Sequence, residues 1–396
     1  MKKFTKLSLV AAVAVAGLSS ANAKPLEEAI KDVDVSGTVT YRYDNFGDDK
    51  TGKETTQSNK YKINFNLSSK VNDYVKFNSR ISVNNHKVGD NDFASLDRGE
   101  SDANPSLTLA HAYFGLSVIP NTTVNVGKQG LATPWTVATD NDGGEQTGTG
   151  IFSVTAVDNF VLGLAYFNQT NINTTKPAGA HLSGAEDIYA ATLQANYGIV
   201  NAEAWYLNTV DNFDTYTAAI HGKADLAENA KIGYEVRYVS LDAGDIAKSL
   251  DSNSLLRVAV DGKVGIVNAR VAYTTTDKDG GLTALDTDAQ NASLGWRLNS
   301  LGKADAKYLQ ATLGADILDN LNFSVHYGKL EFDAGTKTLD HNKTTKGAGE
   351  TAKQDEIFGQ LTYKMSKNLD GYIRYGKQDF DGVEENSGRL QVNYKF

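Results

Sequence analysis

The stretch that decides the fold of this chain is Asp34-Val35-Ser36-Gly37-Thr38-Val39-Thr40-Tyr41-Arg42-Tyr43. From Val35 onward its odd-numbered positions carry mostly apolar and aromatic side chains, and its even-numbered positions carry polar ones. Successive side chains of a β-strand point to opposite faces of the sheet, so this alternation predicts a strand with one apolar and one polar face. Such a strand suits a wall with water on one side and an apolar phase on the other.

The same two-residue period recurs along the chain and predicts eighteen strands. They are expected at 34–43, 60–69, 74–85, 106–118, 122–128, 150–157, 160–169, 187–197, 200–209, 215–226, 230–240, 253–262, 265–276, 306–317, 321–332, 355–365, 369–379 and 387–396. Sixteen strands are the alternative, because residues 150–169 and 196–215 are weakly patterned. Short turns alternate with long loops rich in Gly and Asp. This order indicates an all-β, transmembrane, antiparallel up-and-down barrel with short periplasmic turns and long external loops.

The N-terminus predicts export from the cytoplasm. A basic start, an apolar run and a small-residue cleavage site follow one another: Lys2, Lys3 and Lys6, then Leu7 to Leu18, then Ala21-Asn22-Ala23. Residues 1–23 are therefore expected to be a cleaved secretory signal peptide. Residues 24–396 are expected to form a single barrel domain in the bacterial outer membrane, with 24–33 as a short N-terminal lead.

Composition argues against several classes of function. Cysteine is absent, so no disulfide framework stabilises the exported chain. The 39 basic residues include three leader lysines, which leaves 36 against 48 acidic residues and a net charge near −12. The basic residues are scattered, so no nucleic-acid partner is expected. The six histidines lack metal-ligand spacing, and the chain has no nucleophile elbow or P-loop, so no enzyme activity is expected.

The C-terminal residues repeat the alternation and stop on an aromatic side chain. Leu390, Val392, Tyr394 and Phe396 alternate with Arg389, Gln391, Asn393 and Lys395. Tyr394 and Phe396 are therefore predicted to form the assembly signal of an outer-membrane barrel. The alternative is an amphipathic edge strand that happens to end in phenylalanine.

Four stretches resemble the major outer-membrane porin family of Campylobacter and its relatives. They are 25–37; Tyr41-Arg42-Tyr43-Asp44; Gly127-Lys128-Gln129 with Trp135, Thr139-Asp140-Asn141 and Gly148-Thr149-Gly150; and Arg389-Leu390-Gln391 with Tyr394-Lys395-Phe396. The resemblance implies an eighteen-stranded barrel, a homotrimer, general diffusion of small hydrophilic solutes, a preference for cations, and calcium at the constriction. Here the loop reads Asp142-Gly143-Gly144-Glu145, which departs from the family pattern.

The third long loop, 129–150, is the candidate constriction. Asp140, Asp142 and Glu145 are its candidate pore-lining acids and the possible calcium ligands, and no cofactor is otherwise required. The candidate lumen arginines are Arg42, Arg80, Arg237, Arg257, Arg270, Arg374 and Arg389. Acids on the loop facing guanidinium groups on the wall would set a transverse field. Alternatively, the arginines pair with neighbouring carboxylates such as Glu235 or Asp261.

These patterns predict a porin for passive diffusion of ions and small hydrophilic solutes. Most of the loops on the long-loop side carry net negative charge, including 44–59, 87–105, 277–305 and 381–386, which predicts weak cation selectivity. Lipids and lipopolysaccharide of the outer membrane are the expected surroundings. The alternative is a surface adhesin or structural barrel whose loops bind host or partner molecules, with loop 129–150 projecting outward. A substrate-specific channel would need an aromatic ladder or a basic track, and the sequence shows neither clearly.

Overall fold

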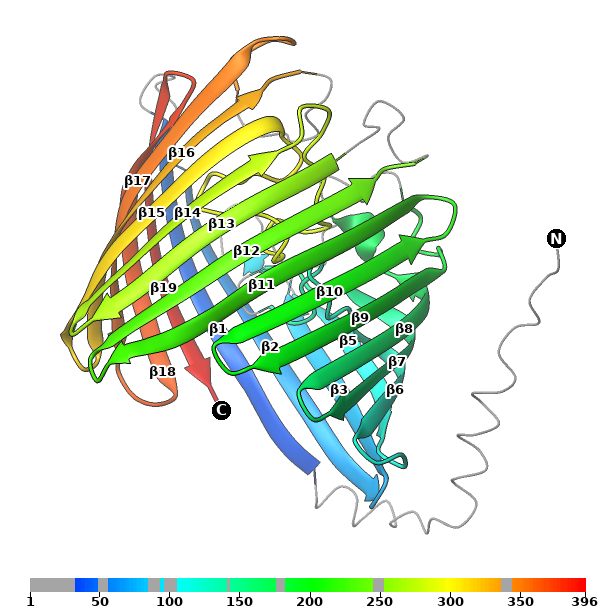
Figure 1. The fold of residues 1–396 in the computed structure, drawn as a ribbon. Coiled ribbons are helices and arrows are strands. Elements are labelled where there is room, and N and C mark those ends of the chain that lie inside the picture. Colours follow the sequence, from blue (N-terminus) through cyan, green and yellow to red (C-terminus); the bar gives the residue numbers. More distant parts are fainter. Residues whose placement is uncertain are drawn as a thin grey trace.

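The computed structural model describes residues 33–48, 56–84, 93–95, 105–140, 143–175, 182–244, 253–335 and 344–396, which form one sheet closed into a barrel (Figure 1). The strands are β1 Val33–Asp48, β2 Thr56–Asn72, β3 Val75–Asn84, β4 Ala94–Ser95, β5 Ser106–Leu116, β6 Thr122–Gly130, β7 Thr147–Val157, β8 Phe160–Thr170, β9 Ile188–Tyr197, β10 Val200–Thr209, β11 Phe213–Ala227, β12 Ala230–Asp242, β13 Asn253–Val264, β14 Val267–Thr276, β15 Ala304–Leu318, β16 Leu321–Asp333, β17 Thr351–Lys364, β18 Leu369–Phe380 and β19 Val383–Lys395. One turn of 3₁₀ helix, η1, spans Ile172–Thr174.

The barrel wall has eighteen antiparallel strands, as the sequence predicts. β4 pairs only with β2, while β3 pairs directly with β5, so β4 is an addition beside the wall. The weakly patterned regions do form the wall strands β7 to β11, so the sixteen-strand alternative is wrong. In the described residues, no helix is long and apolar enough to cross a membrane.

The two faces of the strands follow the predicted alternation. In β13, Leu256, Val258 and Val260 are 44–48% exposed on the outside, whereas Arg257 is 9% and Ala259 2% exposed on the inside. An apolar outer face is compatible with lipid, and closure pairs the backbone groups that lipid could not solvate. The polar positions therefore line the lumen.

The barrel closes where β1 meets β19. Thr38 to Asp48 pair with Lys395 to Glu385, and Gly37 exchanges two backbone hydrogen bonds with Phe396, of 2.8 and 3.1 Å. A Cβ on Gly37 would lie 2.5 Å from the Phe396 ring, so glycine is required where this ring crosses the seam. The ring also packs edge-on against Phe65, at 5.8 Å between centroids. Phe396 thus belongs to the closing seam.

Four boundaries differ from the expectation. The predicted loop 381–386 is wrong: β18 and β19 are joined by Asp381-Gly382, both at positive φ, and the next residues continue the strand. Asp-Gly favours this tight hairpin turn. Residues 210–212 likewise form a short turn on the long-loop side. The constriction loop runs over 131–146, because its predicted ends lie in β6 and β7. Val33 already pairs with Ser69, and the predicted leader, residues 1–23, lies outside the described residues.

Candidate channel constriction

Two loops enter the lumen and meet there. Loop A, residues 131–146, joins β6 to β7, and loop B, residues 277–303, joins β14 to β15. Backbone hydrogen bonds link the two loops, from Leu285 N to Trp135 O at 2.8 Å and from Asn291 N to Pro134 O at 3.0 Å. The amide of Gln146 donates to the Asp286 carboxylate at 2.7 Å. The narrow zone is therefore built by two loops.

Loop A is tied to the wall by an ion pair inside the barrel. The Arg80 guanidinium on β3 donates to the Glu145 carboxylate through Nε, at 3.1 and 3.0 Å, and through Nη2, at 2.5 Å. Both side chains are as buried as typical core residues, with Arg80 5% and Glu145 4% exposed. The same carboxylate accepts the backbone N–H of Asp140 at 2.9 Å, which fixes the turn of the loop.

A lysine on the neighbouring strand also holds loop A. The Lys62 side chain on β2 is fully buried, and its ammonium donates to the carbonyl oxygens of Asp140 at 3.0 Å and Gly143 at 2.7 Å. The ammonium lies 4.0 Å from Glu145 Oε1. Two cations from adjacent strands thus converge on one short loop segment.

An apolar cluster packs beneath both loops. Trp135 of loop A is fully buried, and Leu282 and Leu285 of loop B are each 1% exposed. They share a cluster with inward-facing wall residues such as Leu207 and Leu241. Burial of apolar surface stabilises the folded state by about 25 cal/mol per Å² of surface removed from water. Loop B is therefore a packed element of the lumen.

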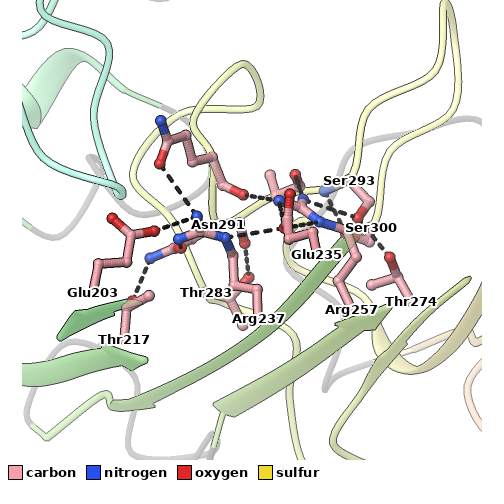
Figure 2. A network of polar contacts seen from close by, with 12 residues as sticks. Glu203, Thr217, Glu235, Arg237, Arg257, Thr274, Thr283, Asn291, Ser293 and Ser300 are labelled. Atoms are coloured by element: carbon pink, nitrogen blue, oxygen red, sulfur yellow. Dashed lines mark hydrogen bonds and ion pairs between the residues drawn. The ribbon is translucent and has the colours of Figure 1, made fainter. Parts of the chain in front are cut away.

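Two arginines of adjacent strands hold the middle of loop B (Figure 2). Arg257 on β13 donates to the carbonyl oxygens of Ala292 and Gln290, each at 2.8 Å. Arg237 on β12 donates to the Asn291 side chain at 3.2 Å. Glu235 lies between them and accepts from Arg257 at 2.6 Å and from Arg237 at 3.2 Å.

Neutral hydrogen bonds complete this network. The Asn291 side-chain amide donates to Thr217 at 2.7 Å, and the Asn291 backbone carbonyl accepts from the Thr283 hydroxyl at 2.7 Å. The hydroxyls of Thr274 and Ser293 lie 2.6 Å apart. Figure 2 shows Thr217 of β11 and Thr274 of β14 directed toward loop B. Many bonds, each of modest strength, therefore fix the loop.

The far end of loop B is held by a carboxylate on β17. Glu356 is 2% exposed and accepts the backbone N–H groups of Trp296 at 3.0 Å and Arg297 at 2.8 Å. A Cβ on Gly295 would lie 1.7 Å from this carboxylate, so only glycine fits at that position. This contact holds the loop against β17, two strands beyond β15.

A basic wall lies on β18, β19 and β1. Arg374 and Arg389 are direct cross-strand partners, an arrangement in which like charges repel. Arg389 pairs with Asp44 at 2.5 Å, and Arg42 donates to Gln391 at 2.9 Å. Arg374 donates to Gln360 at 2.8 Å and is surrounded by the rings of Trp296, Phe358 and Tyr372, at 4.9–5.2 Å.

Acidic side chains of both loops stand in the field of this basic wall. Burial raises the pKa of the Asp288 carboxyl to about 6, with further contributions from Asp286 and Asp140, while Arg42 and Arg389 act in the opposite direction. Burial likewise raises the pKa of the Asp140 carboxyl. A Cβ on Gly143 would lie 2.6 Å from Asp140 Oδ2 and 3.1 Å from Asp288 Oδ2. The two loop tips therefore present their carboxylates side by side.

The structure places the predicted arginines as follows. Arg42, Arg80, Arg237 and Arg257 are buried on the lumen side, Arg374 and Arg389 belong to the basic wall, and Arg270 lines the lumen cavity. Arg257 and Arg270 pair with Glu235 and Asp261, the partners that the alternative named. The Arg270 pair is 3.4 Å long, with both side chains more than a third exposed. A cavity of about 500 Å³ extends from loop B to Arg270 and Arg374.

Sequence reasoning missed loop B and the lysine. Loop B was expected to be external, although its leucines and Trp296 are unusual for a solvated loop and would have indicated burial. Lys62 lies in the strand predicted at 60–69, and no pattern in the sequence singles it out. Asp286 and Asp288 were missed together with loop B, because their position depends on where that loop folds.

The calcium site that the family resemblance implies stays a prediction, because the structure describes only two of its three candidate ligands, Asp140 and Glu145. Asp142 lies outside the described residues. The Glu145 carboxylate is taken by Arg80, and the carbonyl oxygens of Asp140 and Gly143 are taken by Lys62. Within the described ranges, no group of three His, Asp or Glu side chains could hold a metal ion.

Comparison with known proteins identifies the kind of barrel. The model of the Campylobacter major outer membrane protein family matches residues 1–195, which confirms the predicted resemblance over that half. No curated protein sequence matches the chain.

Solved structures of outer-membrane channels share the fold. OpdK of Pseudomonas aeruginosa, solved with vanillate, has a TM-score of 0.71 at 14% identity, covering 92% of this chain and 99% of OpdK. OccAB3 of Acinetobacter baumannii has a TM-score of 0.70 at 16% identity, with 92% and 99% covered. OpdQ of Pseudomonas aeruginosa has a TM-score of 0.66 at 14% identity, with 93% and 99% covered. At these identities the likeness concerns the fold.

Proposed function

With the Campylobacter major outer membrane protein family matched in its first 195 residues and an outer-membrane porin barrel as its fold, we propose that this chain is a general-diffusion porin. It forms a water-filled channel through which ions and small hydrophilic solutes cross the bacterial outer membrane passively. The barrel, the family match and the lumen loops support this function.

One observation carries the proposal. Asp140 of loop A and Asp288 of loop B interact electrostatically with Arg42 on β1, and Asp288 also with Arg389 on β19, and we infer that a transverse field crosses the narrow zone. Polar solutes can orient in such a field. Apolar solutes gain no favourable interaction from it, and entering it means leaving a more favourable environment. The arrangement favours small hydrophilic solutes.

The channel is proposed to be weakly cation-selective. Asp140, Asp286 and Asp288 raise the local cation concentration in the narrow zone, and the chain as a whole is acidic. Arg374 and Arg389 oppose this effect from the facing wall. Because positive and negative side chains lie close together in the narrow zone, the preference for cations is small.

The remaining parts of the proposal concern assembly. A homotrimer follows from the family resemblance, and the apolar outer face of the barrel suits lipids and lipopolysaccharide of the outer membrane. An exported precursor with a cleaved leader at residues 1–23 completes the proposed route to the membrane.

The position of loop A supports a channel over a surface adhesin. An adhesin was expected to project this loop outward. Instead Glu145 and Gly143 contact Arg80 and Lys62, which are buried on the lumen side of β3 and β2. Loop A therefore shapes the interior of the barrel.

Single-channel conductance of the refolded protein in a planar bilayer tests this function, with the reversal potential measured under a KCl gradient. We expect large open steps, grouped in threes for a trimer, and a small reversal potential of the sign that K⁺ preference gives. Circular dichroism is the control for folding. Silent insertion of a folded barrel would overturn the porin proposal, and a reversal potential favouring chloride would overturn the selectivity.

A further inference from the structure

We propose that the cavity of about 500 Å³ beside loop B is a binding site for short zwitterionic peptides. The ammonium group of the peptide lies at Asp288, and its carboxylate lies at Arg374 and Arg270. The inference rests on the proposed function, since it names a class of solute that the channel admits. Its test measures binding and needs no conduction.

The cavity lies between loop B and the inner face of the barrel. Its lining includes residues 287–290 and 292–295 of loop B, and the other side chains come from strands β13 to β18. Binding sites for small molecules have volumes of roughly 300–1,000 Å³. The cavity is therefore large enough for a solute of several residues' size, held between a loop and a wall.

Two of the charged groups that line the cavity are already used to hold loop B. Arg257 donates to the Glu235 carboxylate at 2.6 Å and to two backbone carbonyl oxygens of the loop, each at 2.8 Å. Glu356 accepts two backbone N–H groups of the loop, at 3.0 and 2.8 Å. Neither group has its charge available for a solute.

Three other charged groups of the lining remain available. Within the described residues, the Asp288 carboxylate accepts no hydrogen bond and has no ion-pair partner, since only its backbone N–H is bonded. Arg374 donates from Nε to Gln360 at 2.8 Å, and no carboxylate of the described chain lies within ion-pair distance of it. The ion pair between Arg270 and Asp261 is 3.4 Å long and exposed. The cavity thus offers one negative and two positive groups.

The positions of these charges favour a solute with a charge of each sign. Asp288 belongs to loop B, whereas Arg270 and Arg374 belong to β14 and β18. A guanidinium forms strong, charge-assisted hydrogen bonds with a carboxylate, but a solute with only that charge is repelled by the loop acid. A free dipeptide has an ammonium group at one end and a carboxylate at the other, and spans roughly 7 Å. It can therefore satisfy both sides of the cavity at once.

Apolar side chains complete the lining. Leu294 of loop B is 39% exposed, and Phe358 of β17 also faces the cavity. Such surfaces contact the side chains of a peptide without hydrogen bonds that would select one of them. We therefore expect selection for the two terminal charges and tolerance of the peptide sequence.

The experiment compares three ligands on the refolded barrel in detergent, by titration followed through the broadening of ligand NMR lines. The ligands are alanyl-alanine, N-acetyl-alanyl-alanine, which lacks the ammonium group, and alanyl-alanine amide, which lacks the carboxylate. EDTA is present throughout, so that no divalent ion competes for the Asp288 carboxylate. We expect the native chain to bind alanyl-alanine more tightly than either blocked ligand.

Substitutions at the two ends should separate the ligands. Asp288→Asn should raise the Kd of alanyl-alanine roughly 5-fold and should not weaken binding of the N-acetyl ligand. Arg374→Gln should raise the Kd of both ligands that have a carboxylate, roughly 10-fold, and should not weaken binding of the amide. Should Arg374→Gln fail to refold, Arg270→Gln tests the same end, because its ion pair is exposed.

Asp261→Asn is the matched control for Asp288→Asn. It also removes one acidic charge, but from the partner of Arg270 and not from the proposed ammonium contact. Because Arg270 is then free to bind the solute, the Kd of alanyl-alanine should fall about 2-fold. A rise equal to that of Asp288→Asn would show a general effect of charge and overturn the inference.

The outcomes distinguish this inference from the proposed function. A folded barrel that conducts ions but binds the three ligands equally, or none of them, overturns the zwitterion site and leaves the porin standing. The same holds if Asp288→Asn weakens all three ligands alike. A barrel that shows the expected pattern of binding but conducts no ions keeps the site and overturns the porin.

Discussion

Loops A and B both narrow the lumen, yet the barrel holds them by different physical means. Loop A is fixed by charges that converge on a short segment, with Arg80 and Lys62 directed at Glu145 and its neighbouring carbonyls. Loop B is fixed along its length: Arg257 donates to backbone carbonyls, Arg237 donates to the Asn291 side chain, and Glu356 accepts from backbone amides. One loop therefore depends on a few strong contacts and the other on many weaker ones.

This difference determines how each loop should respond to substitution. A buried charge left without its partner has no water to stabilise it, so the loss is concentrated at one residue. A lost neutral hydrogen bond costs less, and the remaining bonds of the network still hold the loop. Loop A should thus fail at single positions, while loop B should weaken gradually.

The largest effect is expected for Arg80→Ala. It leaves the Glu145 carboxylate buried with only the more distant Lys62 as a cationic partner, and should lower the free energy of unfolding by about 3–5 kcal/mol. Denaturant unfolding measures the loss. The double variant Arg80→Met with Glu145→Gln should recover much of it, because no charge is then unpaired. Equal losses in the single and double variants would contradict the charge-based anchoring of loop A.

A smaller effect is expected for Arg257→Ala in loop B. It removes bonds to Gln290 O and Ala292 O, but Glu235 keeps Arg237 as a partner, so the loss should be about 1.5–3 kcal/mol. The same unfolding measurement compares it with Arg80→Ala. A loss exceeding that of Arg80→Ala would reverse the proposed difference between the loops.

The Asp288 carboxyl at the tip of loop B should make ion selectivity sensitive to pH. Burial raises the pKa of Asp288 to about 6, so this carboxyl is ionised at neutral pH and becomes protonated as the pH falls through 6. Cation preference should therefore decrease between about pH 7 and pH 5, read as the reversal potential under a KCl gradient. Asp288→Asn should have the lower preference throughout and lose this step. A step of equal size in Asp288→Asn would assign the titration to another group.

The raised pKa of Asp288 also predicts how pH changes the stability of the folded loop. An acid whose pKa is raised on folding binds its proton more tightly in the folded chain. Lowering the pH through the window from 6 down to the ordinary value of 3.8 should therefore favour the folded loop at this residue.

The smallest effect on stability is expected for Arg270→Gln. Its pair with Asp261 is 3.4 Å long and exposed to the lumen, so the free energy of unfolding should change by less than about 1 kcal/mol. The variant should still increase cation preference slightly, because one lumen cation is lost. A loss comparable to that of Arg257→Ala would show that exposure to the lumen does not weaken a wall ion pair.

The wall of the barrel was predictable because its signal is local. Alternation in a segment such as 34–43 requires only that water lie on one side and lipid on the other, and each strand contains that information by itself. Even the error at 381–386 had a local remedy, since Asp381-Gly382 is a hairpin signal. The eighteen wall strands therefore agree with the expectation within a few residues at most ends.

The constriction was predictable only in part. Loop A could be singled out by its place as the third long loop and by its acids, and the resemblance to a known family added to this. Loop B is also polar and rich in Gly and Asp, so its sequence resembles that of an external loop. Its leucines were the one feature that could have indicated burial. The arginines could be assigned to the lumen, and two of their partners, Glu235 and Asp261, could be named only as an alternative.

By itself, the sequence determined the strands, the side of the wall on which each residue lies, and an acidic chain directed to the outer membrane. The tertiary structure decided that Lys62 meets the carbonyls of loop A, that Arg257 and Glu356 meet loop B, and that Asp288 stands beside Asp140. The reason is physical: side-chain alternation is a property of neighbouring residues, whereas these contacts join segments dozens to hundreds of residues apart. Closing the barrel is what brings those segments together.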